Sequence, residues 1–272
     1  KSFDVTTILT AAVSNIIVFI LLGQRYEYED AKFRQLLKIL SENIQIVGSP
    51  AVLENMKMIN GGYFHNENLK GLVADLFGAG TETTANTLCW AILLMMKYPE
   101  IQSKVQEEIA KEIGIRQPQS DLQAKLPYTN AVIHEVQRFA DIVPSNLPHA
   151  ATMDVTFKGF FIPRGMYIIP LLTSVLHDES QWEKPHEFYP EHFLDSEGKF
   201  VKRDAFMPFS AGRRICADEN LAKMELFLFF TSLLQRFTFH PPPGTSKDDL
   251  DLTPILGLTA SPVPFKICAM LH

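Results

Sequence analysis

The sequence predicts a mainly α-helical protein with a small β-sheet region. Apolar residues recur at helical spacing over most of the chain, whereas alternating β-branched and aromatic residues are confined to short stretches after residue 150. The 272 residues, of which 46% are hydrophobic and 21% charged, are enough to bury a substantial core. Composition therefore predicts a globular chain that forms one large domain or two small ones.

The helices are expected in the first half of the chain and again near its end. Periodicity and end signals predict them at residues 5–22, 29–46, 66–97, 99–114, 127–139 and 217–236. The first contains the most apolar segment, which Ser14 and Asn15 interrupt and which is shorter than the roughly 20 residues of a membrane-spanning helix. We expect it to be a buried core helix.

The strands follow the helices. Residues 154–162 and 166–170 are rich in β-branched and aromatic side chains, and Pro163, Arg164 and Gly165 stand between them, so a hairpin turning at these three residues is predicted. Extended structure is also expected from about Leu252 to the C-terminus.

Charge and cysteine content exclude some classes of function. The net charge of −6 argues against a nucleic-acid-binding protein, which usually has a basic excess. The three cysteines are widely spaced, which fits neither a disulfide framework nor a zinc site and suits a reducing compartment. No basic leader precedes an apolar stretch, so no targeting segment is expected.

One cysteine stands in a setting that favours a metal ligand. Cys216 follows a Gly/Ser turn with two arginines and directly precedes an apolar helix, where backbone N–H groups and the helix dipole favour the thiolate. The alternative is a free structural cysteine, because unpaired cysteines are usually small buried hydrophobes. The arginines and the glycine favour the ligand interpretation, since they suit a flat, anionic group such as a porphyrin.

The same loop carries a recognisable spacing. Phe209, Gly212, Arg214 and Cys216 match FxxGxRxC, and the segment resembles the haem-binding loop of the cytochrome P-450 family. The resemblance implies that Cys216 ligates haem iron and that the other three residues help to bind the cofactor.

A second motif lies inside the long helix predicted at 66–97. AGTETT, residues 79–84, combines small residues, an acid and hydroxyls that lower helix propensity. Ala79 and Gly80 would give clearance to a ligand on a haem face, and Glu82 and Thr83 would deliver protons during oxygen activation. The sequence resembles the oxygen-activation signature of the same family. The alternative is that the threonines only bond the carbonyl of the preceding turn.

A third and a fourth motif predict a structural cluster. Glu135 and Arg138 are three residues apart and share one helix face. PEHF, residues 190–193, resembles the meander of the family, where a basic residue, here His192, joins the Glu and Arg. The resemblance implies a buried cluster that holds this loop in front of the haem.

The resemblance also assigns residues around the cofactor and the substrate. His149 would bond a haem propionate together with Arg214, and Val143 and Leu147 would line the substrate pocket. A lone histidine is more often an ordinary polar residue, and core packing explains the two apolar residues equally well.

The four motifs occur in the order of the family, and the match runs along the whole chain. It is similar to vertebrate-type microsomal members that metabolise drugs, xenobiotics and fatty acids. The implied architecture is a partial cytochrome P-450 fold, with residues 1–272 as a single incomplete domain. The N-terminal part and the helices that roof the substrate pocket are expected to be missing, with a junction near Leu53 and Glu54.

The implied activity is that of a haem-thiolate monooxygenase that hydroxylates apolar small molecules with O₂. Electrons would come from an NADPH-dependent flavoprotein reductase, for which four residues could form a basic patch: Lys202, Arg203, Arg213 and Lys223. The alternative is a merely solvated set of charges. The family implies the cytoplasmic face of the endoplasmic reticulum membrane, although no anchor or targeting segment is expected in this sequence.

One departure from the family pattern favours a different outcome. Asp218 stands where the pattern has glycine two residues after the cysteine. A carboxylate there adds bulk and raises the cysteine pKa by charge repulsion, while the helix N-terminus partly offsets this. The first rival is therefore a shortened, non-catalytic product with weak or no haem binding. The second is a helical interaction protein with no haem ancestry.

Overall fold

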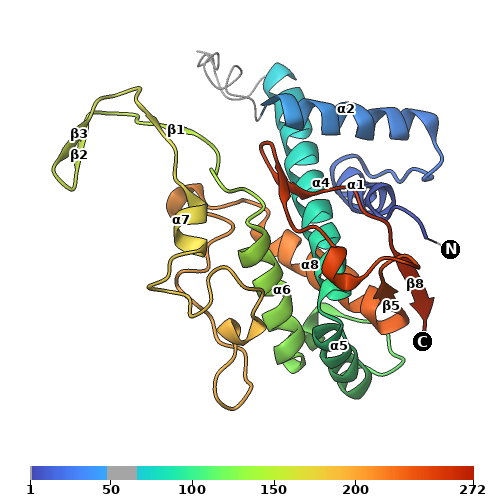
Figure 1. Ribbon diagram of the computed structural model, residues 1–272. Coiled ribbons are helices and arrows are strands. Elements are labelled where there is room, and N and C mark those ends of the chain that lie inside the picture. Colours follow the sequence, from blue (N-terminus) through green and yellow to red (C-terminus); the bar gives the residue numbers. More distant parts are fainter. Residues whose placement is uncertain (1, 48–65) are drawn as a thin grey trace.

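The computed structural model describes residues 2–47 and 66–272, and these are mainly helical (Figure 1). The predicted fold class is confirmed, and each predicted helix end lies within two residues of the observed one. The expected junction near Leu53 and Glu54 lies outside the described residues. The helices are α1 Thr6–Leu22, α2 Ala31–Val47, α4 Asn66–Lys97, α5 Pro99–Glu112, α6 Pro127–Ala140, the short α7 Leu172–Leu176 and α8 Glu219–Arg236.

Helix α4 forms the centre of the molecule. From Ala85 to Met96 nearly every side chain is buried, and a helix that is apolar on all sides lies in a core rather than on a surface. Helices α5, α6 and α8 surround this C-terminal half and share one large hydrophobic cluster with it. The N-terminal half of α4 packs against α1 and α2, and α1 also contributes Leu9 and Val13 to the large cluster.

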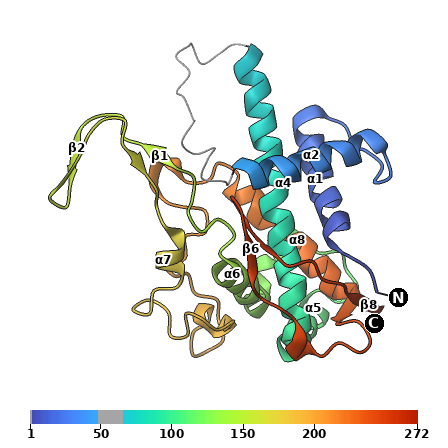
Figure 2. The ribbon, with the colours of Figure 1, turned by 45° about the horizontal axis from the view of Figure 1, so that its top comes forward.

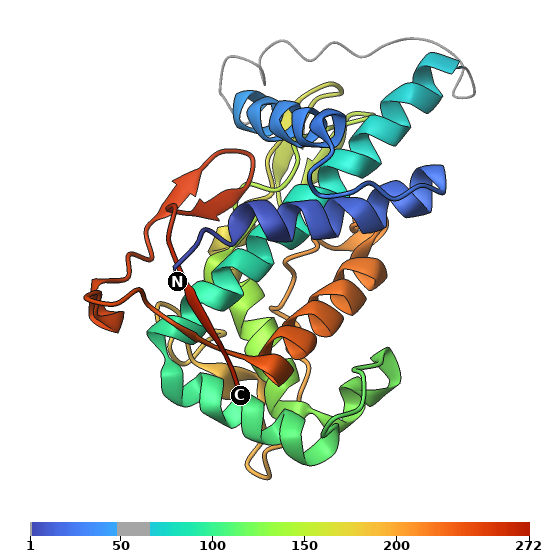
Figure 3. The ribbon, with the colours of Figure 1, turned by 90° about the vertical axis from the view of Figure 1, so that its right-hand side faces the viewer.

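Helix α1 crosses α4 and buries one face against it (Figure 3). Val13 and Ile17 are buried, whereas Phe19 and Ile20 are more than half exposed, so the predicted core helix is buried on one side only. The polar interruption has a structural partner: the Asn15 amide donates to the Tyr26 carbonyl at 2.9 Å and accepts from its N–H at 2.8 Å. In the described part of the chain, no helix has the length and apolar character needed to cross a membrane.

The predicted hairpin is wrong in its turn and its pairing. Strand β2, Val155–Phe157, pairs with β3, Phe160–Ile162, across Lys158 and Gly159. These two residues have φ of 48° and 86°, and two consecutive positive φ values are typical of the tight type I′ turn. The predicted strand at 154–162 therefore contains both strands and the turn.

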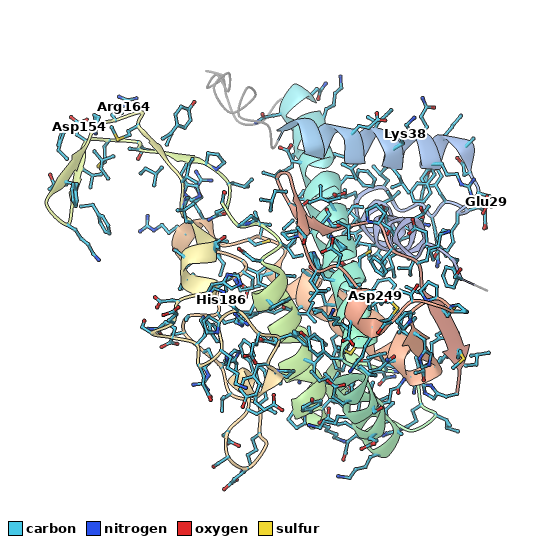
Figure 4. All side chains as sticks on the ribbon, in the orientation of Figure 1. Glu29, Lys38, Asp154, Arg164, His186 and Asp249 are labelled. Carbon is cyan, nitrogen blue, oxygen red and sulfur yellow. The ribbon has the colours of Figure 1, made fainter. Side chains whose placement is uncertain are left out.

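The expected partner strand pairs elsewhere. Strand β4, Tyr167–Ile168, pairs with β1, His149–Ala150, and the two pairs together form an arm that projects from the helical body (Figure 2). Asp154 and Arg164 lie near each other on the arm (Figure 4), where the Asp154 carboxylate accepts the Arg164 backbone N–H at 2.7 Å. Pro163–Gly165 is a turn within the arm rather than the hairpin tip, because the Met166 N–H returns to the Pro163 carbonyl at 3.1 Å.

The C-terminal segment is extended, as expected, and lies against the helices. Strand β5, Phe237–His240, pairs with β8, Cys268–Leu271, and β6, Pro254–Leu256, pairs with β7, Ala260–Pro262. The β6–β7 hairpin contacts α4. All four sheets in the described ranges are two-stranded and antiparallel.

Candidate functional site

The loop before α8 positions Cys216. Ser210 and Gly212 both have positive φ, 65° and 74°, and these two residues turn the chain so that the Cys216 N–H donates to the Phe209 carbonyl at 3.0 Å. The thiol then lies just before the first turn of α8 and is exposed. The loop therefore presents a cysteine at a helix N-terminus, as the sequence predicts.

Three effects act on the protonation of this thiol. Partial burial raises the pKa of Cys216, the Asp218 backbone N–H lowers it, and the carboxylates of Asp218 and Glu219 raise it, with a net upward direction. The acid at 218 thus opposes the thiolate, as its charge predicts. A cation bound to the sulfur would reverse this balance, because metal coordination deprotonates a thiol outright.

The same loop is open on one side. Residues 211–217 are all exposed, including the apolar Ile215 at 44%. Within the described ranges, the guanidinium groups of Arg213 and Arg214 have no hydrogen-bonding or ionic partner. An exposed thiol, an exposed apolar side chain and two unpaired cations on one loop suit a flat ligand that combines a metal, an apolar ring and anionic groups. The donor set therefore fits haem.

A neighbouring segment is fastened to this loop. The Asn146 amide donates to the Ser210 hydroxyl at 2.9 Å, and Asn146 itself has a positive φ of 52°. This contact brings the residues before β1 close to the loop of Cys216. Leu147, which is 57% exposed, and half-buried His149 belong to that segment. Val143 instead packs against the main core, which agrees with the packing alternative for that residue.

The second motif lies on the less buried face of α4. Ala79 is exposed, and Glu82 and Thr83 are half-buried, while their neighbours Thr81 and Thr84 are buried. The Thr83 hydroxyl donates to the Ala79 carbonyl at 2.7 Å, which is the bond that the structural alternative predicts. Such a bond leaves the hydroxyl oxygen able to accept a further proton donor.

Glu82 is held differently. Burial raises its pKa, and a hydrogen bond from the Asn86 amide at 3.3 Å lowers it, with a net upward direction. A carboxyl group whose pKa is raised is a better proton donor near neutral pH than an ordinary surface glutamate. The chemistry of Glu82 therefore suits proton transfer on this face.

Gly80 has a packing reason as well as the predicted one. A Cβ at Gly80 would lie 2.9 Å from Cδ1 of Ile17 on α1, so glycine lets the two helices approach closely. Exposed Ala79 leaves free space on the other side of the helix. Only one of the two small residues thus lies on the open face.

Helix α4, which carries the second motif, packs against α8, which follows the loop of Cys216. Thr87, one turn after Thr83, lines a small apolar cavity together with Leu226 and Phe230 of α8. Helix α6 contributes Ile133 and Val136 to the same cavity. In residues 2–47 and 66–272, no hydrogen bond or ion pair joins Glu82 or Thr83 to the loop of Cys216. A bound group would have to bridge the two.

The structure brings Glu135, Arg138 and His192 together in full burial. Arg138 donates to both carboxylate oxygens of Glu135, at 2.8 and 2.7 Å, and His192 Nδ1 lies 3.2 Å from the same carboxylate. His192 Nε2 accepts the Lys184 N–H at 3.1 Å, which assigns the ring proton to Nδ1. The cluster fixes the long loop between α7 and α8.

The four basic residues of the expected patch differ in their surroundings. Lys223 is paired with Glu219 at 2.5 Å, and the Arg203 Nε donates to the His192 carbonyl at 2.7 Å. Lys202 and Lys223 both act on half-buried His134, whose pKa is lowered to about 4, by burial first and by these charges further. Two of the four residues therefore lie near His134.

Two polar residues near the site were not predicted from the sequence. Asn86 lies within the most buried stretch of α4, where its low helix propensity was a usable signal. Glu225 is buried in α8, and burial together with Asp218 raises its pKa to about 7. The all-round apolar pattern of α8 gave no sign of which face would enclose the acid.

Comparisons with known proteins agree with these motifs. The cytochrome P450 family profile matches residues 50–269. Cytochrome P450 2K1 of Oncorhynchus mykiss is 46% identical over 328 residues, which cover 99% of this chain and 65% of that protein. Cytochrome P450 2K6 of Danio rerio is 44% identical and Cytochrome P450 2D26 of Rattus norvegicus 43%, each over 98% of this chain and 65% of its own length.

The chain thus spans about 65% of the length of the curated relatives that it matches. The family profile covers most of the chain, and the relatives align along nearly all of it. The chain belongs to the cytochrome P450 family, and its similarity is to members of family 2.

Proposed function

We propose that this chain contributes the haem-binding and oxygen-activating part of a monooxygenase that hydroxylates apolar small molecules. The observation that carries the proposal is the exposed Cys216 thiol on an open loop whose two arginines have no partner among the described residues, in a chain of the cytochrome P450 family. When bound, a haem with a thiolate ligand supplies the electron-rich iron that favours O–O bond cleavage.

The residues of the chain would divide the remaining work. Cys216 would hold the iron, Phe209 and Gly212 would shape the loop beneath the ring, and Arg214 with His149 would pair with the propionates. Glu82 would bring a proton to the open face of α4 and pass it by way of the Thr83 hydroxyl. Leu147, exposed beside the loop, and Val143 would contact an apolar substrate.

The partners follow from the same proposal. An NADPH-dependent flavoprotein reductase would dock near Cys216, where Lys202, Arg203, Arg213 and Lys223 lie in or beside the loop. Its acidic surface would meet these cations, so association would weaken with added salt. By resemblance to the family, we place this activity at the cytoplasmic face of the endoplasmic reticulum membrane.

Turnover measurements test the proposal. With reductase and NADPH, the haem-loaded protein should convert an apolar substrate to its hydroxylated product, and Thr83→Ala and Glu82→Gln should lower the product formed per O₂ consumed by about tenfold or more. Thr84→Val is the matched control, because Thr84 is buried on the same helix and should leave this ratio unchanged. Equal ratios in all variants would contradict the assigned roles.

A second function, that of a shortened non-catalytic product, is favoured by two observations. The alignment with Cytochrome P450 2K1 extends over 328 residues, more than the 272 of this chain, so part of the relative inside the alignment has no counterpart here. Asp218 also raises the pKa of Cys216. In this view, residues 1–272 form a single incomplete domain that keeps the helical core.

Haem titration of the unliganded chain separates the two functions. If Asp218 alone weakens the site, Asp218→Gly should tighten haem binding, because removing this carboxylate lowers the pKa of Cys216 and favours the thiolate. If the chain is non-catalytic because it is shortened, Asp218→Gly should bind haem no better than the parent. Cys268→Ser, which changes another free cysteine, controls for non-specific effects.

A further inference from the structure

Asn86 joins two segments that are far apart in the sequence. It lies one helical turn after Glu82 on α4, and its side chain is 7% exposed. Its Nδ2 atom lies 2.8 Å from the Ser261 hydroxyl, 3.3 Å from the Thr259 hydroxyl and 3.3 Å from Oε1 of Glu82. Because an amide nitrogen carries only two hydrogens, these three acceptors share them, and the Ser261 contact is the shortest.

Hydrogen bonds hold the hairpin residues that Asn86 contacts in place. Trp90 donates from Nε1 to the Ala260 carbonyl at 2.9 Å, and the Ala260 N–H donates to the Ile142 carbonyl at 2.8 Å. Ala260 stands between Thr259 and Ser261, so bonds to α4 and to the segment just after α6 hold the backbone from which both hydroxyls project. The β6–β7 hairpin lies beside α4 in Figure 1.

The two strands of the hairpin differ in exposure. Ile255 and Leu256 of β6 are 48% and 70% exposed, whereas Thr259, in the turn between the strands, is 6% exposed. Because Ile255 pairs with Ser261, a contact on the exposed strand β6 can be transmitted to the hydroxyl that Asn86 bonds. Asn86 is the residue through which the hairpin reaches the carboxylate of α4.

We propose that Asn86 is a positioning residue, which fixes the carboxylate of Glu82 on the open face of α4 and couples its orientation to the β6–β7 hairpin. The consequence for proton delivery rests on the proposed function of Glu82. Without Asn86, the carboxylate would lose the donor that orients it and would rotate among its allowed conformers.

The electrostatic surroundings of Glu82 agree with this role. Burial raises its pKa and the Asn86 amide lowers it. Cys89, two turns further along α4, interacts electrostatically with Glu82 and with Asp4, which precedes α1. The pKa of Cys89 is raised to about 12 by burial, so this thiol is neutral and does not compete for the amide.

The pKa of Glu82 in the unliganded full chain tests the proposal directly. Carbon-13 labelling of the glutamate carboxyl groups, with Glu82→Gln to assign the resonance, follows its titration by NMR. Asn86→Ala should raise the pKa of Glu82 by about 0.5 or more, because it removes a donor to the charged form. Ser261→Ala should raise it by less, since Asn86 remains but loses its anchor.

Asn86→Ser is the conservative variant and keeps a shorter donor, so it should restore part of the change. If Asn86 only stabilised the fold, Asn86→Ala and Ser261→Ala would lower the melting temperature and leave the pKa of Glu82 as it is in the parent. That result would overturn the proposal. If Asn86→Ala does not fold, Ser261→Ala and Asn86→Ser give the same comparison.

The outcome is distinguishable from failure of the proposed function. The titration needs no haem and no turnover, so a raised pKa in Asn86→Ala supports the positioning role even in a chain that binds no cofactor. An unchanged pKa in a chain that does bind haem overturns the positioning role and leaves the proposed function standing. In an active preparation, Asn86→Ala should also shift the pH profile of product formation, which Thr84→Val should not.

Discussion

Replacing Arg138 tests the part of the structure that holds the loop in front of the proposed cofactor. The side chain is 0% exposed and makes five hydrogen bonds, two of them to Glu135. The other three go to the carbonyls of Leu176, Pro185 and Glu187 at 2.9, 2.8 and 2.9 Å. Arg138→Met keeps much of the volume and removes all five bonds.

The expected loss is large. Removing one partner of a buried ion pair costs about 3–5 kcal/mol, because the remaining charge is left uncompensated. Each of the three orphaned carbonyls adds about 1 kcal/mol or more, so the total is at least about 6 kcal/mol. Folded domains are stable by only about 5–15 kcal/mol, so Arg138→Met should be close to unfolding at 25 °C.

Urea unfolding followed by circular dichroism measures this loss in the unliganded chain. Arg138→Lys keeps the charge but has at most three donors, so it should lose about 1–3 kcal/mol and still fold. The matched control is Arg34→Met, because Arg34 pairs with Glu29 on the surface with side chains 53% and 81% exposed, and its loss should stay below about 1 kcal/mol. Equal losses in Arg34→Met and Arg138→Met would refute the reasoning.

Three further predictions concern Glu225, His134 and two glycines of α4. Because the pKa of Glu225 is raised to about 7 in the folded chain, this group ionises first in the unfolded chain as pH rises. Stability should therefore fall between about pH 4.5 and 7, and Glu225→Gln should abolish about 1–3 kcal/mol of that fall in urea unfolding. The lowered pKa of His134, about 4, has the opposite sign: stability should be lost as pH falls from about 6.5 to 4, and His134→Leu should resist acid better in the same assay. In thermal unfolding, Gly71→Ala should stabilise α4 by about 0.5–1 kcal/mol, since its Cβ meets nothing within 4 Å. Gly80→Ala should not show this gain, because its Cβ would clash with the Ile17 side chain, and adding Ile17→Val should restore the gain. A pH-independent Glu225→Gln difference, an acid-sensitive His134→Leu or equal effects of the two glycine variants would contradict these expectations.

The helices were predictable because their signals are local. Pro99 and Pro127 stand at first helical positions, where the missing N–H costs nothing, and the apolar period continues from each of them. The arm was less predictable because Lys158 at positive φ is uncommon for a residue with a side chain, so Pro163–Gly165 gave the stronger but misleading turn signal.

The candidate site was predictable only where its residues lie in short motifs. Cys216 and the Glu135–Arg138 pair are defined by spacings of a few residues. Asn86 and Ser261 are 175 residues apart in the sequence, and only the packed fold shows that they meet. No periodicity of the sequence indicates such a contact, because the contact depends on where the β6–β7 hairpin meets α4.

The most direct test of the account is the absorption spectrum of the haem-reconstituted chain, reduced and exposed to carbon monoxide, beside Cys216→Ser. Thiolate ligation by Cys216 predicts a strongly red-shifted Soret band that Cys216→Ser loses and that Cys268→Ser keeps. A chain that takes up no haem, or a band that Cys216→Ser leaves in place, would contradict the claim that Cys216 holds the iron.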